Sequence, residues 1–273
     1  MNTEQEIKEM VREKYGAIAK QSKEQNQSSC CGSGSGCGCS NVEFSVMSED
    51  YTKLPGYVAD ADLALGCGLP TEFALIKPGD TVVDLGSGAG NDCFIARSIV
   101  GDSGHVIGVD MTEAMIDRAR SNAANLGFMN VEFRLGDIDA MPIQDNTVDV
   151  VVSNCVMNLV PNKKKAFGET FRIIKDGGHI SISDIVLQGE LPDNLRKEAT
   201  LYAGCISGAV QKEEYLRIIK EAGFTNILVQ KDREIEIPNE IYTKILTVDQ
   251  ISEYKKSLIG IFSITVYAEK PGL

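Results

Sequence analysis

Short apolar runs alternate with amphipathic stretches along most of this 273-residue chain. The apolar runs are rich in β-branched residues, which is typical of buried strands, and the amphipathic stretches repeat apolar positions at helical spacing. This α/β alternation predicts a parallel sheet with helices on both faces. We expect strands near 81–84, 106–110, 131–135, 148–153, 179–183 and 226–230, and helices near 91–100, 112–126, 162–175 and 211–222.

Three regions depart from the alternation. Residues 1–41 combine an amphipathic helix, expected to dock on the main domain, with a polar segment rich in Ser, Gln, Gly and Cys. Residues 42–273 form the predicted main domain, with insertions near 185–210 and 237–257. Because ligands of open α/β sheets bind outside the carboxyl ends of the strands, we expect both insertions to form a lid over a ligand.

Composition narrows the class of protein. The chain is 43% hydrophobic and 24% charged, as globular domains are, and 27 basic against 39 acidic residues give a net charge of −12. This charge disfavours a nucleic-acid partner, and the basic run Lys163-Lys164-Lys165 is expected to be a solvated helix face. There is neither a bilayer-spanning apolar stretch nor an apolar export signal. We therefore expect a cytoplasmic protein without a membrane partner, whose eight cysteines are mostly reduced thiols.

The first strand runs into a glycine-rich loop, which is the clearest candidate for a ligand site. Asp84 ends the apolar run, and the loop carries Gly86, Ser87, Gly88 and Gly90 before a helix that begins near residue 91. Glycine tolerates positive φ and has no Cβ, so the backbone of such a loop can lie directly against a ligand. Dinucleotide-binding enzymes use the same device, but with the glycine spacing G-x-G-x-x-G.

Acids also follow the next two strands. Asp110 lies twenty residues beyond Gly90, the offset at which a carboxylate meets ribose hydroxyls. Asp137 follows the third strand, with Ile138 beside it. Each acid taken singly fits a helix cap or a loop residue equally well, but three in register favour a shared site.

This pattern resembles the Rossmann-like, S-adenosylmethionine-dependent methyltransferases. The resemblance implies a doubly wound, mostly parallel seven-stranded sheet whose final strand, near 258–268, runs antiparallel. It also implies a methyl donor, S-adenosylmethionine, whose adenine amino group would reach Asp137, with Ile138 and Met111 packed on the two faces of the ring. Asn154 joins these candidate cofactor residues.

Four cysteines lie outside the polar segment, and three of them indicate the kind of substrate. Cys67 lies between two glycines before the first strand, Cys155 follows the fourth strand, and Cys205 lies in the first insertion, so all three are expected at one rim of the fold. Three thiolates at one point would bind a soft, thiophilic centre. Cys93, early in the helix after the glycine loop, is expected to be a buried small hydrophobe.

The three cysteine motifs together resemble the arsenite methyltransferases. Their Gly-Cys-Gly, Ser-Asn-Cys-x-x-Asn and Gly-Cys-x-x-Gly segments match the surroundings of Cys67, Cys155 and Cys205, and the N-terminal Val-Arg-Glu-Lys-Tyr-Gly is similar too. The resemblance implies arsenic detoxification by methylation of trivalent arsenic, or thiol-bound arsenite, on three thiolates. This chain differs from better-known members of the family in two features. Those members have a C-terminal extension, and they have a Tyr- and Arg-bearing stretch at the place of residues 185–188 in this chain.

The polar segment carries a second group of cysteines, Cys30, Cys31, Cys37 and Cys39. Their spacing fits poorly with the usual hairpin ligands of zinc or iron–sulfur sites. Family members place here a cysteine that exchanges electrons with the arsenic-binding thiols, which makes Cys31 a candidate catalytic residue and a thiol reductant such as thioredoxin or glutathione a candidate partner. A flexible thiol segment that captures arsenite or another soft metal is an equally open interpretation.

Two other functions share parts of this pattern. A small-molecule C- or O-methyltransferase of the quinone-biosynthesis type would use the same cofactor motifs, but would have no need of the three cysteines. A non-catalytic thiol or metalloid-binding protein would keep the fold and the thiols without turnover. Methylated arsenic products distinguish the leading hypothesis from both.

Overall fold

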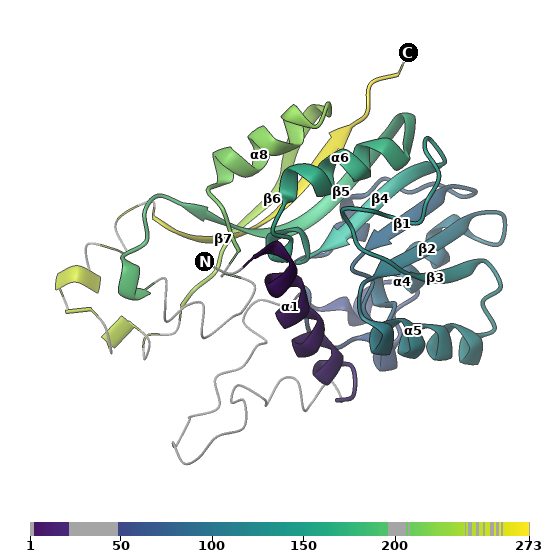
Figure 1. The fold of residues 1–273 in the computed structure, drawn as a ribbon, viewed down its shortest axis with the longest axis horizontal. Coiled ribbons are helices and arrows are strands. Elements are labelled where there is room, and N and C mark those ends of the chain that lie inside the picture. The colour runs from purple at the N-terminus through teal and green to yellow at the C-terminus, as the bar shows by residue number, and fades with distance from the viewer. Residues whose placement is uncertain are drawn as a thin grey trace.

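A single twisted sheet organises the chain in the computed structural model (Figure 1). The structure describes residues 3–21, 49–195, 206, 208–237, 239, 242–243, 246–247, 249–251, 254, 257 and 259–272. Within them, seven strands lie in the order β3-β2-β1-β4-β5-β7-β6. They are β1 (Thr81–Leu85), β2 (His105–Asp110), β3 (Val131–Leu135), β4 (Val148–Asn154), β5 (Ile174–Gln188), β6 (Thr225–Glu234) and β7 (Gly260–Glu269).

Strands β1 to β5 pair in parallel, and β7 pairs antiparallel with both β5 and β6. The helices are α1 (Glu4–Ile18), α3 (Pro70–Phe73), α4 (Asn91–Val100), α5 (Glu113–Leu126), α6 (Lys163–Ile173) and α8 (Lys212–Glu221). The doubly wound sheet with an antiparallel final strand, predicted from the sequence, is confirmed. None of the described helices has the length and apolarity needed to cross a bilayer.

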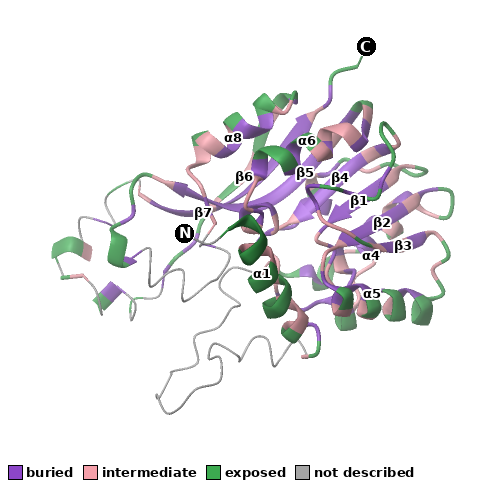
Figure 2. Ribbon diagram, in the orientation of Figure 1, coloured by how far each residue is buried: buried purple, intermediate pink, exposed green. Residues whose placement is uncertain are grey.

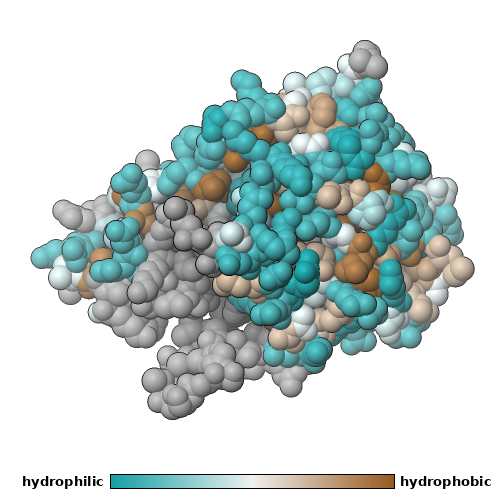
Figure 3. Space-filling model, viewed as in Figure 1, coloured by the Kyte–Doolittle hydropathy of each residue, from teal (hydrophilic) through white to brown (hydrophobic). Residues whose placement is uncertain are grey.

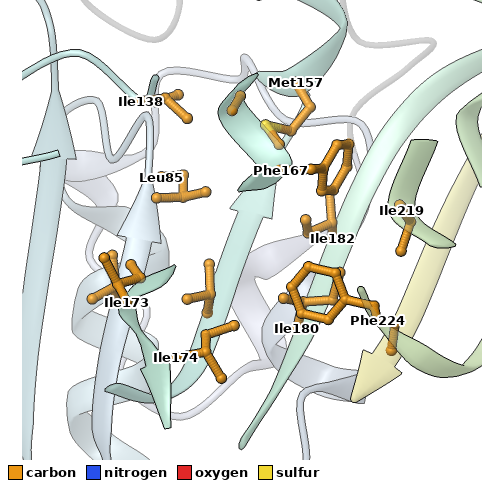
Figure 4. Packing of buried hydrophobic residues seen from close by; sticks show 14 of the residues in the cluster. Leu85, Ile138, Met157, Phe167, Ile173, Ile174, Ile180, Ile182, Ile219 and Phe224 are labelled. Atoms are coloured by element: carbon orange, nitrogen blue, oxygen red, sulfur yellow. The ribbon is translucent and has the colours of Figure 1, made fainter. Parts of the chain in front are cut away.

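The core is divided by the sheet into two layers, because successive strand residues point to opposite faces. Val83 and Leu85 pack in a cluster with residues of α6 and α8, whereas Val82 packs with residues of α4 and α5. Figure 2 shows the buried strands between helices that are exposed on their outer sides. In Figure 4, Leu85 and Phe167 belong to the first layer, where Phe167 meets Tyr215 edge to face at 5.6 Å.

One strand boundary and the environment of one lysine differ from what the sequence predicts. β5 continues through Gln188, because Ile185 to Gln188 pair with the first residues of β7, so no lid begins at residue 185. Lys163 is not part of a solvated face: it is buried, and its ammonium donates to the carbonyls of Asn158 and Val160. The sequence does not distinguish Lys163 from the two lysines that follow it, although Lys163 is buried and the other two are exposed.

Helix α1 crosses the carboxyl ends of the strands (Figure 1). Its N-terminus is closed by a capping box of Thr3 and Glu6, and none of its residues is fully buried. Lys8 anchors it to the domain through ion pairs with Asp137 at 3.0 Å and Asp139 at 2.8 Å. The outward surface over α1 is accordingly hydrophilic (Figure 3).

Candidate cofactor and thiol site

A cavity lies beneath α1, at the carboxyl ends of β1, β2 and β4. Its volume is about 1130 Å³ with the open space at its mouth included, and Lys8, Val11 and Tyr15 of α1 form part of its wall. Small-molecule sites of α/β sheets commonly lie at this place, outside the carboxyl ends of the strands. The position and lining of the cavity therefore fit a small-molecule ligand.

The glycine loop forms the floor of the cavity. Gly86 has φ +66°, and a Cβ at this position would lie 2.5 Å from a methyl group of Val156. Gly88 also has positive φ, and its added Cβ would meet only the Met115 sulfur at 4.0 Å. The space above Gly88 is thus open, and a ligand can approach the backbone there.

Asp110 at the end of β2 fixes the loop. Its two carboxylate oxygens accept the backbone N–H groups of Gly88 at 3.0 Å and Thr112 at 2.8 Å. Burial raises the pKa of this carboxyl, and the two backbone hydrogen bonds oppose that rise. The carboxylate still has lone pairs for a ligand, because each oxygen can accept more than one hydrogen bond.

Acidic side chains predominate among the charged residues in the wall of the cavity. Five carboxylates line it and Lys8 is the one basic residue among the described lining residues; the acids are Asp62, Asp84, Asp92, Asp110 and Asp137. Burial, reinforced by the charge of Asp92, raises the pKa of Asp84 well above its ordinary value. Burial also raises the pKa of Asp92 to about 6, although hydrogen bonds from Asn154 and Tyr51 lower it. Such a wall favours a cationic ligand.

Nine of the ten residues predicted to bind a cofactor line this cavity: Asp84, Gly86, Ser87, Gly88, Asp110, Met111, Asp137, Ile138 and Asn154. Gly90 is not among the lining residues. It is the N-cap of α4 at φ +99°, and an added Cβ would lie 2.9 Å from the rings of Phe94 and Phe133, so close packing also requires a glycine there. Direct contact of the ten residues with a cofactor stays a prediction.

Sequence reasoning missed Asp92 and Tyr51 as wall residues. Asp92 carries a usable signal, an acid in the first turn of the helix after the loop, where the helix dipole already favours negative charge. Tyr51 lies in a short 3₁₀ turn, Tyr51–Lys53, that no periodic pattern marks. It becomes recognisable only from the fold, which brings its hydroxyl within 3.0 Å of Asp92.

Cys67 and Cys155 come together beside the cavity. Cys67 is fully buried, Cys155 is 5% exposed, and both belong to one apolar cluster with Ile185 and Ile206. Both thiols also contribute to raising the pKa of Tyr215, after its burial and its contact with Asp184. The predicted convergence of these two cysteines at one rim agrees with this arrangement.

Of the remaining cysteines that the sequence analysis discusses, the structure describes Cys93 but not Cys205 or Cys31. Cys205 and Cys31 lie outside the described residues, and among the residues that are described no group of three His, Cys, Asp or Glu is placed to hold a metal ion. Ile206, next to Cys205 in sequence, is buried in the cluster of Cys67 and Cys155. Cys93 is buried as predicted, and its thiol donates to Asp84 at 3.3 Å.

Glycines beside the cysteines allow the backbone to pack closely. A Cβ on Gly66 would lie 2.7 Å from the Asn154 side chain, and one on Gly68 would lie 2.5 Å from the Ser183 hydroxyl. The Gly-Cys-Gly motif is thus explained by packing of the Cys67 segment onto β4 and β5. Gly208 is tighter still, because its Cβ would lie 1.9 Å from the carbonyl oxygen of Asn158.

Replacing Gly208 by alanine is expected to destabilise the protein by about 1 to 3 kcal/mol, since the added methyl group must displace backbone. Urea unfolding followed by circular dichroism measures the change. Gly168→Ala is the matched control, because a Cβ there meets no atom within 4 Å. Equal stability of Gly208→Ala and Gly168→Ala would contradict the packing described for Gly208.

A buried polar group lies under the thiols. Asp184 accepts the hydroxyl of Tyr215 at 3.0 Å and the backbone N–H of Ile185 at 2.9 Å. Burial raises the pKa of Asp184 to about 7, while the Ile185 N–H and the nearby Lys163 ammonium lower it. The native state therefore binds a proton at Asp184 at a pH where the unfolded chain does not.

We expect this group to make the protein less stable as pH rises from 5 to 8, by roughly 2 kcal/mol, because the raised pKa penalises the ionised form. Asp184→Asn should remove that part of the pH dependence and raise stability at pH 8. Urea unfolding at both pH values tests this, with Asp149→Asn, at an ion pair with Lys175, as control. An Asp184→Asn protein with the parental pH dependence would contradict the assignment.

Comparisons with known proteins agree with the cavity and the cysteine motifs. The sequence profile of a family described as "Methyltransferase domain" matches residues 76–223, more than half of the chain. The chain belongs to this methyltransferase-domain family. The matched range includes the glycine loop and strands β1 to β5, which hold the cavity described above.

Comparison of this methyltransferase with individual relatives gives a more specific result than the family match. It is 44% identical over 247 residues to an arsenite methyltransferase of Halobacterium salinarum, and 34% identical over 241 residues to one of Aquipseudomonas alcaligenes. The alignments cover 85% and 84% of this chain, but 61% and 65% of the relatives, so the chain spans less than two thirds of their lengths. The resemblance predicted from the cysteine motifs is thereby confirmed.

A solved structure supports the same relationship. The methyltransferase matches an arsenic(III) S-adenosylmethionine methyltransferase from Chlamydomonas reinhardtii with a TM-score of 0.63 and 33% identity. The match covers 76% of this chain and 68% of the other. The methyl donor of the family, S-adenosylmethionine, is the cofactor predicted from the loop and the acids.

The residues of this methyltransferase fit that cofactor. The Ser87 hydroxyl and the Asn91 side-chain oxygen are buried in the cavity wall without a hydrogen-bond partner among the described residues. An amino-acid end offers them a carboxylate acceptor and ammonium donors. The buried carboxylates Asp84 and Asp92 suit a ligand that carries a sulfonium and an ammonium charge. Both sets of groups lie next to the open floor at Gly88.

Proposed function

We propose that this methyltransferase transfers methyl groups to trivalent arsenic bound by Cys67, Cys155 and Cys205, as a step of arsenic detoxification. The observation that carries the proposal is the burial of Cys67 and Cys155 in one cluster beside the cofactor cavity, whose wall includes Cys155. Ile206 in the same cluster supports a third thiol from Cys205. The relatives that act on arsenite support the choice of acceptor.

The thiols determine the chemistry of the acceptor. Three thiols condense with arsenite, As(OH)3: each sulfur replaces one hydroxyl and each thiol proton leaves with that hydroxyl as water, so that a pyramidal arsenic with three thiolate ligands and a lone pair remains. That lone pair is the nucleophile, so no general base is required. S-adenosylmethionine, when bound, supplies an electrophilic methyl group.

The chain contributes position and exclusion of water. The glycine loop and the acids Asp84 and Asp92 hold the cationic donor on one side, while Cys155 presents the acceptor from the end of β4. Holding two reactants in such a geometry lowers the barrier by several kcal/mol. The two histidines lie in strands: His105 contacts Glu132 at 3.0 Å and His179 contacts the Ala74 carbonyl at 2.6 Å. Both contacts fit structural roles.

Methyl transfer raises the formal oxidation state of arsenic by two. We propose that a thiolate of the cysteine-rich segment, Cys31 first among them, attacks one arsenic-bound sulfur. The sulfur–sulfur bond forms, the arsenic–sulfur bond breaks, and its electron pair stays on arsenic, which returns to the trivalent state. A cytoplasmic thiol reductant such as thioredoxin or glutathione would then reopen the disulfide. In the predicted division into 1–41 and 42–273, this proposed redox role would belong to the first part.

An acceptor comparison tests the proposed function. The full chain is incubated with S-adenosylmethionine and a thiol reductant in three parallel reactions. Each reaction contains one acceptor: arsenite, antimonite or a phenolic quinone precursor. We expect methylated arsenic in the arsenite reaction, resolved by chromatography with elemental detection. A protein that binds the cofactor but methylates the phenol in preference to arsenite would instead support the quinone-type alternative.

A further inference from the structure

The side-chain amide of Asn154 connects the two cysteine-bearing segments. Asn154 ends β4, directly before Cys155, and its Oδ1 accepts the backbone N–H groups of Cys67 at 3.0 Å and Gly68 at 3.3 Å. Its Nδ2 donates to the Gly68 carbonyl at 2.8 Å. One side chain on the Cys155 strand therefore sets the position of the Cys67 backbone.

The amide is itself held from behind. The Tyr51 hydroxyl and, at 3.2 Å, Asp92 Oδ2 also lie within hydrogen-bond reach of Asn154 Nδ2, so that three acceptors surround its two N–H groups. The Tyr51 hydroxyl in turn lies 2.9 Å from the Gly68 carbonyl and 3.0 Å from Asp92 Oδ2. Tyr51 and Asp92 are buried, and hydrogen bonds are stronger in such a low-dielectric setting. These contacts leave the amide one orientation, with its oxygen toward the Cys67 N–H.

Each cysteine backbone has a second constraint. Cys155 has φ +60°, a left-handed conformation that costs about 1 to 2 kcal/mol for a residue with a Cβ, and its N–H donates to the Ser183 carbonyl at 2.8 Å. The Cys67 carbonyl accepts the Ser263 hydroxyl of β7 at 2.6 Å. The backbones of both cysteines are thus held by contacts within the protein itself.

We propose that Asn154 is a positioning residue that holds Cys67 and Cys155 as a preformed dithiol. The proposal rests on the proposed function and adds to it a residue that contacts no arsenic. A ligand that bridges two thiolates gains affinity when they are already ordered, because it does not bear the conformational entropy of bringing them together. Without the amide, the Gly66–Gly68 segment loses its polar attachment to β4.

A dithiol probe tests this without turnover. Phenylarsonous acid condenses with two thiols, forming two arsenic–sulfur bonds and releasing two waters. The full chain is used with Cys30, Cys31, Cys37, Cys39 and Cys205 replaced by serine, so that Cys67, Cys93 and Cys155 remain. In this parent, Asn154→Ala is expected to weaken probe binding, measured by titration calorimetry, by about tenfold or more.

Asn130→Ala is the matched control, because the Asn130 side chain likewise links separate segments, through hydrogen bonds to Arg97, Gly101 and Gly104, but is not among the residues that line the cavity. It should bind the probe as the parent does, even where its melting temperature falls as much. Equal probe affinity of Asn154→Ala and Asn130→Ala would overturn the proposal. If Asn154→Ala does not fold, Tyr51→Phe replaces it: it keeps both Asn154 Oδ1 contacts, and a twofold to fivefold weakening is expected, against no change if the proposal is wrong.

Failure of the proposal and failure of the proposed function give different results. If Cys67→Ser in the same parent leaves probe affinity unchanged, Cys67 and Cys155 are not a dithiol site, and the thiolate assignment fails. If Cys67→Ser abolishes tight binding while Asn154→Ala has no effect, the thiolate site stands and only the positioning role is wrong.

Discussion

Replacing Cys155 by serine is expected to lower the rate of arsenite methylation by about 100-fold or more while S-adenosylmethionine affinity changes less than about threefold. A hydroxyl is a poor ligand for a soft centre, so arsenic would be held by fewer sulfurs and displaced from the methyl donor. The cavity wall contributed by the Cys155 backbone remains, because serine is nearly isosteric. The rate is measured with labelled methyl donor, and the affinity by calorimetry on the same preparation.

Cys93→Ser is the control for this substitution. Cys93 is equally buried, and a serine hydroxyl can replace its thiol as donor to Asp84. The Cys93→Ser variant should methylate arsenite at close to the wild-type rate. Parental activity in Cys155→Ser, or an equal loss in Cys93→Ser, would contradict the assignment of Cys155 as an arsenic ligand.

Replacing Asp92 by asparagine is expected to weaken S-adenosylmethionine binding by roughly 10- to 100-fold at pH 7.5. The substitution removes a buried negative charge from the cavity wall, while the asparagine oxygen can still accept from Tyr51 and Asn154. Because burial raises the pKa of Asp92 to about 6, the wild-type carboxyl is ionised at pH 7.5 and mostly protonated at pH 5. Wild-type affinity should therefore fall as pH is lowered through 6.

Asp149→Asn serves as the charge-matched control, since Asp149 lies outside the cavity and pairs with Lys175. Its cofactor affinity should equal that of the wild type at both pH values. Asp92→Asn should show a weaker pH dependence, to which Asp84 still contributes because its pKa is also raised. An Asp92→Asn protein with wild-type affinity at pH 7.5 would show that the cofactor cation does not interact with this carboxylate.

Most of the fold is predictable from the sequence because each strand is a short β-branched run between helical repeats. β1, β2 and β3 fall where the pattern places them, and the antiparallel last strand follows from the family resemblance. The length of β5 is not predictable, since Ile185 to Gln188 read equally well as the start of an insertion. Only their pairing with β7 settles it.

Site residues are predictable from the sequence where a residue type in a given context indicates one kind of role. Glycines at positive φ, acids after strands and cysteines beside glycines all carry such signals, and nine of the ten predicted cofactor residues line the cavity. Tyr51 carries none, because its partners, the Gly68 carbonyl and the Asp92 carboxylate, come from other segments of the chain. The burial of Lys163 carries none either, because its partners are backbone carbonyls, of Asn158 and Val160. Asn154 is among the predicted cofactor residues, but its contacts with the Cys67 and Gly68 backbone are not predictable from the sequence. Contacts of that kind arise only when the sheet brings those segments together.

The central claim is that the cavity and the thiols form one active site. A single-turnover reaction tests it most directly, with the full chain loaded with one equivalent of arsenite and one of methyl-labelled S-adenosylmethionine, cofactor binding being verified in the same sample. We expect the label to move to arsenic, about one methyl group per bound arsenic, and this transfer to be lost in Cys155→Ser. A complex that retains both ligands and transfers no label to arsenic would show that the cavity and the thiols are not one active site.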